Sequence, residues 1–339
     1  MDDIALLIRN PVEQTNFNKI LITGATGFVG NALCKELTAG DFEIRLLVRN
    51  PTRPEFKTES EKTHIVYGDL LNTESLNLAC ADQQIVIHLA GITHVNNGNF
   101  GESRRSIVDG TKNLLEAAIR NHVERFVYVS SSLAQVANSG TGAITHYGLL
   151  KKAAEDLLLE ANSNGLIEVV ILRPVNVYGV GMQGNIAAMI AMIVRRRLPP
   201  LPVLNARISL VGVADLARAL RLAIGAKQAI GKTYIVTDGQ QYRITEIEAA
   251  IYAALDRRFP RWRTPHMVLF TAALIAGFMA RFMAGHQGKG SAIGLRTYRN
   301  ITHDNLFDNR AISLELGFQP STTLYKELPK IVAKISRSN

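Results

Sequence analysis

The stretch Thr23-Gly-Ala-Thr-Gly-Phe-Val-Gly30 decides the fold of this chain. It follows an apolar run, Lys19–Thr23, that is typical of a short buried strand, and it leads into a helical pattern over Asn31–Leu37. The first of the three glycines permits a tight turn, the second lets the backbone approach a ligand phosphate, and the third lets the helix pack on the strand. Amide N–H groups at the start of a helix favour an anion. The stretch therefore predicts a backbone cradle for a phosphate group.

The composition is that of a folded protein with more than one domain. The chain has 339 residues, of which 47% are hydrophobic and 20% charged, with a net charge of +9 and a pI near 9.6. This positive balance suits an anionic ligand. The only tight basic cluster, Arg195-Arg196-Arg197, fits either a solvated helix end or a phosphate-binding site. No nucleic-acid-binding motif is present in the sequence.

Further features bear on where the protein works. Cys34 and Cys80 lack metal-ligand spacing, so we interpret them as small core residues and expect a cytoplasmic protein with no bound metal. The stretch Met1–Arg9 has too short an apolar run for a signal peptide. The longest apolar stretch, Met267–Ala280, is too short to span a bilayer. We expect it to form a helix that is buried or faces a partner, with membrane contact as the alternative.

The order of the predicted elements indicates an α/β fold. Short apolar segments rich in β-formers recur at Ile44–Val48, His64–Tyr67, Ile85–Leu89, Phe126–Ser130 and Val169–Leu172. Helical patterns separate most of them, notably Gly110–Arg120 and Leu149–Glu160. Apolar strands joined by crossover helices predict a parallel sheet that is covered on both faces, a Rossmann-type doubly wound sheet. Ligands bind such sheets beyond the carboxyl ends of the strands.

Residues at the ends of the predicted strands indicate how a dinucleotide would be held. About 20 residues past the last glycine, where an acidic residue would hold an adenosine ribose, the chain has Arg49. A guanidinium suits the 2′-phosphate of NADP, which we therefore favour over NAD; alternatively, Arg49 stacks on adenine and accepts either cofactor. Asp69 either accepts a hydrogen bond from the adenine amino group or forms a turn. The small residues within His88–Gly91 leave room for a ligand.

The residues that carry the predicted chemistry lie between 130 and 151. Tyr147 and Lys151 have i, i+4 spacing at the start of a helical pattern, so they share one face. A phenol is a poor base at neutral pH, and a neighbouring ammonium group stabilises the phenolate. Tyr147 can then exchange a proton with a substrate hydroxyl or carbonyl group. The run Ser130-Ser131-Ser132 follows a predicted strand and offers a hydroxyl that would hold the same oxygen.

These stretches resemble those of the extended short-chain dehydrogenases/reductases, and among them the NAD(P)-dependent epimerase/dehydratase family. The resemblance covers most of the chain and rests on Thr23–Gly30, Gly68–Leu70, His88–Gly91, Val108–Ala117, Tyr128–Ser132, Tyr147–Lys151 and Leu172–Gly179. Further stretches are similar to family members that act on nucleotide sugars for surface polysaccharides: Gly184-Asn185, Arg197–Pro202, Asn205–Val211 and Asp215-Leu216.

The resemblance implies functional roles for particular residues. Ser132, Tyr147 and Lys151 form the implied catalytic trio, with Ser131 as the alternative serine. The implied cofactor contacts are Gly24, Thr26, Gly27, Phe28, Val29, Gly30, Arg49, Asp69, Leu70, Leu89, Ala90, Gly91, Tyr147, Lys151, Pro174 and Val177. The implied substrate contacts are Ser132, Asn176 and Arg207, of which Arg207 would grip a diphosphate.

The resemblance also implies a domain organisation and a reaction. It implies an N-terminal extension over 1–17, an NAD(P)-binding Rossmann domain over 18–180, and a mainly substrate-binding α/β domain over 181–339 with segments that return to the Rossmann domain. The implied substrate is a nucleotide-diphosphate sugar that reacts at C4 by hydride transfer, in an epimerase or in a dehydrogenase or reductase. Relatives are often dimers. The alternatives are an enzyme of an apolar ketone or alcohol, steroid-like or dihydroflavonol-like, and a non-catalytic nucleotide-binding subunit.

The sequence departs from the family pattern at three positions. Family members commonly have an asparagine where this chain has Ile107, a serine where it has Leu150, and an aromatic residue or histidine where it has Gly212. These departures leave the reaction class intact. They bear instead on the identity of the sugar and on the water network of the active site.

Overall fold

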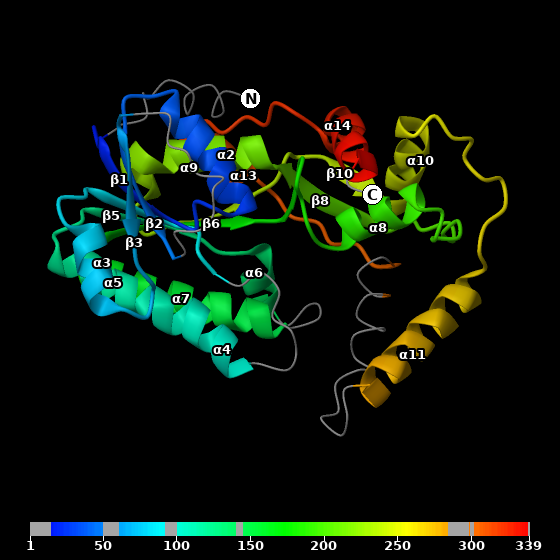
Figure 1. The fold of residues 1–339 in the computed structure, drawn as a ribbon, viewed down its shortest axis with the longest axis horizontal. Coiled ribbons are helices and arrows are strands. Elements are labelled where there is room, and N and C mark those ends of the chain that lie inside the picture. Colours follow the sequence, from blue (N-terminus) through cyan, green and yellow to red (C-terminus); the bar gives the residue numbers. More distant parts are fainter. Residues whose placement is uncertain are drawn as a thin grey trace, which may run out of the picture. The chain divides into compact units, whose positions relative to one another are not determined.

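The structure is a computed structural model that describes residues 15–49, 61–91, 100–139, 145–283, 298 and 302–337, with the backbone alone described for 136–139 and 276–283. The chain divides into two compact units (Figure 1). Unit 1 comprises Met1–Val175, Val213–Val236 and Asp308–Pro320, and unit 2 comprises Asn176–Gly212, Thr237–Phe307 and Ser321–Asn339. Most of the expected N-terminal extension, residues 1–14, lies outside the described residues.

Unit 1 is built on a sheet of seven parallel strands in the order β3-β2-β1-β4-β5-β6-β9. The strands are β1 (Lys19–Thr23), β2 (Glu43–Val48), β3 (Thr63–Tyr67), β4 (Ile85–His88), β5 (Arg125–Val129), β6 (Glu168–Pro174) and β9 (Thr233–Val236). The strand order reverses between β1 and β4, where doubly wound sheets bind their ligands. The predicted Rossmann-type α/β fold is confirmed.

Helices cover both faces of this sheet (Figure 1). The helical segments of unit 1 are α2 (Phe28–Thr38), α3 (Thr73–Cys80), α4 (Phe100–Arg104), a π-helical turn (Arg105–Asp109), α5 (Gly110–Arg120), α6 (Ser132–Ser139), α7 (His146–Ser163), α9 (Val213–Gly225), a 3₁₀ turn (Lys227–Ala229) and α13 (Arg310–Leu316). Helices α3, α5 and α7 lie on one face, and α2, α9 and α13 on the other. Because both faces are covered, β4 and β5 are buried at every residue.

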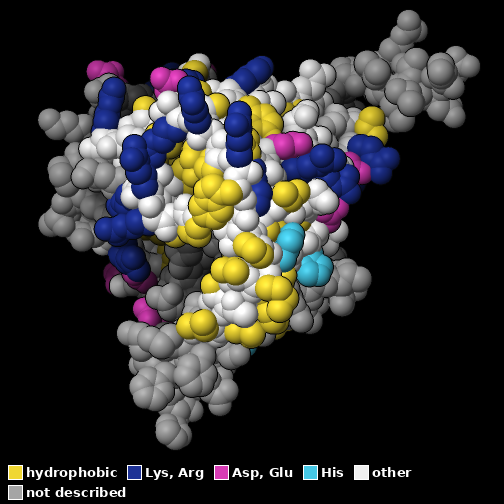
Figure 2. Space-filling view, turned by 90° about the vertical axis from the view of Figure 1, so that its right-hand side faces the viewer, with side chains coloured by type: hydrophobic (Ala, Val, Ile, Leu, Met, Phe, Trp, Pro, Cys, Tyr) yellow, Lys and Arg dark blue, Asp and Glu magenta, His cyan; other side chains and the backbone are white. Residues whose placement is uncertain are grey.

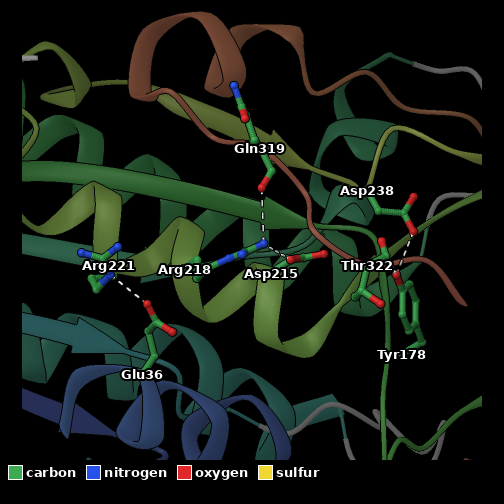
Figure 3. A network of polar contacts seen from close by, with 8 residues as sticks. All are labelled: Glu36, Tyr178, Asp215, Arg218, Arg221, Asp238, Gln319 and Thr322. Carbon is green, nitrogen blue, oxygen red and sulfur yellow. Dashed lines mark hydrogen bonds and ion pairs between the residues drawn. The ribbon is translucent and has the colours of Figure 1, made fainter. Parts of the chain in front are cut away.

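Polar contacts hold the returning segments in unit 1 (Figure 3). The Arg218 guanidinium, on α9, pairs with the buried Asp215 carboxylate and donates to the Gln319 carbonyl oxygen at 3.3 Å. One turn further along α9, Arg221 Nε donates to the Glu36 carboxylate of α2 at 2.8 Å. These contacts tie α9 both to α2 and to the 308–320 segment, so residues far apart in the sequence complete one layer.

Unit 2 is a smaller α/β assembly. Its sheet has the order β10-β8-β7, with β7 (Asn176–Tyr178) parallel and β10 (Gln241–Arg243) antiparallel to β8 (Arg207–Gly212). Its helices are α8 (Asn185–Val194), α10 (Ile244–Ala254), α11 (His266–Met283) and α14 (Leu324–Arg337), of which α14 packs on α8 and α10.

A buried carboxylate organises the sheet edge of unit 2. The hydroxyl groups of Tyr178 and Tyr242 donate to Asp238 Oδ2 at 3.0 and 2.6 Å, and the Tyr178 oxygen also lies 3.2 Å from the Thr322 carbonyl oxygen (Figure 3). The Tyr242 oxygen in turn accepts from the Leu324 N–H at the start of α14. Burial and the hydrogen bond to the carboxylate raise the pKa of Tyr242, which keeps it a donor.

Two expectations about single segments need correction or detail. The apolar stretch near 267–280 does form a helix, α11, but none of its side chains over 266–275 is buried. Of the expected options, the buried helix is therefore wrong, and a helix that faces a partner or a membrane stays a prediction. No described helix is long and apolar enough to cross a membrane. Cys80 is buried in α3 as expected, whereas Cys34 of α2 is only partly buried. Burial raises the pKa of both thiols, to about 12 and about 11 respectively.

Candidate functional site

The glycine turn is a close backbone contact at the carboxyl end of β1. Gly24 has φ +75°, in the left-handed region, and a Cβ atom there would lie 2.6 Å from the Ala90 nitrogen. A Cβ atom on Gly30 would lie 2.2 Å from the Gly24 carbonyl oxygen. Helix α2 begins at Phe28, and no side chain caps its N-terminus. Its first N–H groups therefore remain open to an anion, and a phosphate group fits this cradle.

Arg49 and Asp69 lie at the carboxyl ends of the outer strands. Arg49 directly follows β2 and is exposed, in the position expected of a residue that contacts the adenosine end of a cofactor. Asp69 forms a turn after β3, because its Oδ1 accepts from the Leu71 N–H at 2.9 Å. The Leu70 carbonyl oxygen accepts from the Asn113 side chain of α5 at 3.0 Å. The turn alternative for Asp69 is thus observed, and its contact with adenine stays a prediction.

Lys151 is buried on α7 beneath the ends of the central strands. Its Nζ donates to the Val129 carbonyl oxygen at 2.8 Å and lies 4.5 Å from the centroid of the Tyr128 ring. Burial lowers the pKa of Lys151 to about 8, and the negative charge of Glu155 opposes this shift. Glu155 is itself buried and pairs with Arg173 at 2.8 Å. These contacts fix the position of the lysine side chain. Its ammonium group is charged at neutral pH and loses its proton at a pH only slightly higher.

A close contact joins the first turn of α7, which carries Tyr147, to the first turn of α6, which begins at the end of the serine run. Thr145 caps α7 by accepting from the Gly148 N–H at 2.8 Å, which starts the helix just before Tyr147. A Cβ atom on Gly148 would lie 2.4 Å from the Leu133 carbonyl oxygen, so only glycine permits this approach. The first turn of α7 therefore packs against the first turn of α6, which begins with Ser132.

The three serines differ in their surroundings. Ser132 begins α6 and is buried. The Ser131 hydroxyl oxygen accepts from the Leu133 N–H at 3.2 Å and so closes a local turn. The Ser130 hydroxyl is buried and has no hydrogen-bond partner among the residues that the structure describes. The Ser131 hydroxyl thus has a local partner, and the choice of Ser132 as the serine that meets a ligand stays a prediction.

The protonation state of Tyr147 differs from the simple expectation. Burial raises the pKa of its phenol to about 12, although Lys151 Nζ lies 6.0 Å from the centroid of its ring. Burial disfavours the charged phenolate, and this desolvation raises the pKa. Tyr147 is therefore a neutral hydrogen-bond donor at neutral pH, in the state needed to protonate a carbonyl oxygen.

The sequence alone did not reveal that His88 links the elements of the site. The Thr111 hydroxyl donates to the Ile107 carbonyl oxygen at 2.5 Å, so it accepts from His88 Nε2–H at 3.1 Å. His88 Nδ1 then accepts from the Thr23 hydroxyl at 2.6 Å, and Thr23 Oγ1 accepts from the Ala90 N–H at 3.3 Å. This chain fixes one neutral tautomer. Burial, aided by the charge of Lys151, lowers the pKa of His88 to about 3.

The departures from the family pattern are apolar and buried. Ile107 is buried in the π-helical turn that precedes α5, an irregularity that is frequent at functional sites. A Cβ atom on Gly91 would have Lys151 Nζ and Ile107 as its nearest neighbours, at 3.7 and 4.0 Å. Leu150 is buried in the core beneath α7. Ile107 and Lys151 thus both lie near Gly91, so an apolar side chain stands close to the lysine at a position where asparagine is common in the family.

The remaining predicted site residues belong to the end of β6 and to unit 2. Pro174 ends β6 and is buried, while Asn176 and Val177 lie in β7, with Asn176 exposed. Arg207 begins β8 and is held by Asp304, whose Oδ2 accepts from its Nη2 at 2.7 Å. The guanidinium of Arg207 holds the pKa of the Asp304 carboxyl below its usual range. An anion at Arg207 would therefore share this guanidinium with Asp304.

Comparison with known proteins defines the family. Residues 20–237 match the NAD dependent epimerase/dehydratase family. The chain belongs to this family. As a member, it is an NAD-dependent enzyme of the epimerase or oxidoreductase type, and the resemblance read from the motifs is confirmed.

Curated relatives of this epimerase/dehydratase-family protein include enzymes with polar and apolar substrates. The UDP-glucose 4-epimerase of Vibrio cholerae is 29% identical over 268 residues, which cover 73% of this chain and 78% of the relative. The 3-beta-hydroxysteroid dehydrogenase of Mycolicibacterium neoaurum is 24% identical over 343 residues, which cover 93% of this chain and 90% of the relative.

Solved structures share the fold of this family member. A UDP-glucuronic acid 4-epimerase from Bacillus cereus in complex with NAD superimposes with a TM-score of 0.73 at 20% identity and covers 94% of this chain and 99% of its own. MoeE5 in complex with UDP-glucuronic acid and NAD gives a TM-score of 0.71 at 23% identity and covers 95% of this chain and 100% of its own. At these identities the likeness establishes the fold.

Proposed function

We propose that the protein is a nucleotide-sugar epimerase, or a dehydrogenase or reductase, that transfers hydride at a sugar carbon, C4, with Tyr147 as the acid/base. The observation that supports this proposal is the Gly148–Leu133 contact, which packs the first turn of α7, where Tyr147 lies, against the first turn of α6, where Ser132 lies. The glycine cradle fits a phosphate group at the same edge of the sheet. The similarity to a UDP-glucose 4-epimerase supports a nucleotide sugar as the substrate.

In the proposed mechanism the residues of this chain handle the proton. When bound, the nicotinamide supplies a two-electron acceptor and donor of hydride. In the oxidative direction, the Tyr147 phenolate takes the proton of the sugar hydroxyl as the C–H bond gives up its hydride, and it becomes the neutral phenol. In the reductive direction that neutral phenol gives the proton to the carbonyl oxygen and returns to the phenolate. Ser132 donates a hydrogen bond to that oxygen, and the Lys151 ammonium group favours the phenolate.

The same steps can give two net reactions. If the ketone stays bound and hydride returns to its other face, the net reaction is an epimerisation with no change in cofactor oxidation. If the ketone leaves, or is itself the substrate, the enzyme is a dehydrogenase or reductase. We further propose that Arg49 pairs with a 2′-phosphate and that NADP binds more tightly than NAD.

A second candidate substrate is an apolar ketone or alcohol. The similarity to a 3-beta-hydroxysteroid dehydrogenase over 93% of the chain supports this alternative, and so do the apolar side chains that α11 exposes in unit 2. The same residues, Ser132, Tyr147 and Lys151, would perform the proton transfer.

A panel of substrates separates the candidates. The purified protein is incubated with NAD or NADP and with UDP- and GDP-hexoses, their N-acetyl forms, or a hydroxysteroid, and sugar identity and nicotinamide absorbance are followed together. A 4-epimer without net cofactor reduction identifies an epimerase, and product formed one-for-one with reduced cofactor identifies a dehydrogenase. Turnover of the hydroxysteroid together with no turnover of any nucleotide sugar would overturn the nucleotide-sugar proposal.

A further inference from the structure

Helix α11 exposes apolar side chains over adjoining faces. Met267 is 71% exposed, Ile275 63% and Val268 51%, and no side chain over 266–275 is buried. The helix contains no acidic residue. Phe270 packs edge-on against Tyr298, but most of the other apolar side chains over 266–275 stay exposed. Such an exposed apolar stretch is unfavourable in water and marks a surface that another molecule covers. The charges next to the helix indicate what kind of molecule would bind there.

Arginines gather on the chain segments next to this helix. A hollow of about 640 Å³ in unit 2 is lined by Arg196, Arg197, Arg257, Arg258 and Trp262, together with prolines and apolar residues. Figure 2 looks onto this side of the molecule, where Lys and Arg side chains border apolar ones. Within the described part of the chain, the guanidinium groups of Arg196, Arg197 and Arg258 pair with no carboxylate. The basic cluster at 195–197 thus lies next to Arg257 and Arg258, which the sequence alone did not reveal.

We propose that α11 and the adjacent arginines form a docking surface for an anionic lipid bilayer. Helix α11 lies in the boundary between headgroups and acyl chains, and the arginines contact the lipid phosphates. The Trp262 side chain, which is 60% exposed between the arginines and α11, sits at headgroup level, where tryptophan is favoured. The helix docks on the membrane and does not span it, in line with its length and hydropathy.

Charge and side-chain chemistry favour a bilayer over other occupants. The sequence has no Asp or Glu from Arg257 to His303, so a second copy that offered the same surface would bring arginines and no carboxylate to meet them. A nucleic acid would match the arginines, but the side chains of α11 are mainly aliphatic and give few surfaces for base stacking. An anionic bilayer satisfies both parts of the surface. The inference does not depend on which substrate the enzyme uses.

The single tryptophan of the chain makes the proposal directly measurable. The full-length protein is mixed with vesicles of phosphatidylcholine alone or with added phosphatidylglycerol, and binding is followed by co-sedimentation and by Trp262 fluorescence. We expect binding and a blue shift with the anionic vesicles only, and we expect added salt to weaken the binding. Equal binding to neutral vesicles, or no binding to either, overturns the proposal.

Substitutions in the surface test its two parts separately. Because each arginine near an anionic surface contributes about fivefold in affinity, Arg196→Ser with Arg258→Ser should weaken binding about 25-fold. Met267→Gln with Ile275→Gln should abolish the blue shift. The matched controls, Lys35→Ser and Leu166→Gln, change exposed residues of unit 1 and should bind as the wild type does. Controls that lose as much affinity as the surface variants, or a lipid-free dimer that itself buries Trp262, contradict the proposal.

Discussion

His88 makes the stability of this protein depend on pH in a way that can be calculated. In the folded chain its pKa is lowered to about 3, because the ring is fully buried and close to the charge of Lys151. In the unfolded chain an imidazole has a pKa of about 6.5. The stability that His88 contributes is therefore present above the unfolded value and is lost as the pH falls from there towards 3. Between pH 7 and pH 5 this group alone should remove about 2 kcal/mol from the free energy of unfolding.

The assay is urea unfolding at pH 7 and pH 5, for the wild type and for His88→Asn. The variant is less stable at both pH values, because it disturbs the contacts with Thr23 and Thr111. The test is the decrease in the free energy of unfolding between pH 7 and pH 5. This decrease should be about 2 kcal/mol smaller in His88→Asn than in the wild type. The matched control is His64→Gln, which removes an exposed imidazole on β3 and should keep the wild-type difference.

Two results would refute this reasoning. One is a His88→Asn protein whose stability falls between pH 7 and pH 5 as much as that of the wild type. The other is a proton titration of the His88 ring in the folded wild type, followed by NMR, that is complete by pH 5. The second measurement needs no variant, so it remains decisive even if His88→Asn fails to fold.

Three further outcomes are expected. Gly148→Ala places a Cβ atom 2.4 Å from the Leu133 carbonyl oxygen, so it should lower the free energy of unfolding by about 1 to 3 kcal/mol and remove most of the activity. The control Gly101→Ala has open space around the new Cβ atom and should leave stability and activity unchanged. Thermal unfolding and turnover rates measure both variants. Arg49→Asp should make the protein bind NAD more tightly than NADP in a fluorescence titration, and unchanged preference would count against the 2′-phosphate contact. Because burial lowers the pKa of Lys151 to about 8, kcat/KM should fall about tenfold per pH unit above that value, and Lys151→Met should lose this dependence.

Local patterns in the sequence were enough to predict the cradle and the helix that carries the tyrosine. Gly27 and Gly30 approach residues of the same turn, Gly24 and Ala25, and the Tyr147–Lys151 spacing is a property of one helix. Such features depend on residues that are close in the sequence, so turn and helix patterns predict them well. The parallel sheet followed from the alternation of strands and helices.

The contacts that could not be predicted join residues far apart in the sequence. His88 meets Thr23 and Thr111 only because β1, β4 and α5 are neighbours in the folded unit. The raised pKa of Tyr147 depends on how far the fold buries its phenol, which an i, i+4 spacing does not report. The exposure of α11 depends on which other segments of the fold reach it, whereas its apolar sequence indicated only a helix that is buried or faces a partner.

The central claim is that Tyr147 exchanges the proton of the reacting oxygen, and one comparison tests it most directly. Turnover of the identified substrate is measured for the wild type, for Tyr147→Phe and for Tyr325→Phe, which removes the hydroxyl of a tyrosine in unit 2, while cofactor binding is measured in parallel. The account predicts that Tyr147→Phe binds cofactor as the wild type does but turns over at least about 100-fold more slowly, and that Tyr325→Phe is unaffected. Full turnover by Tyr147→Phe would contradict it.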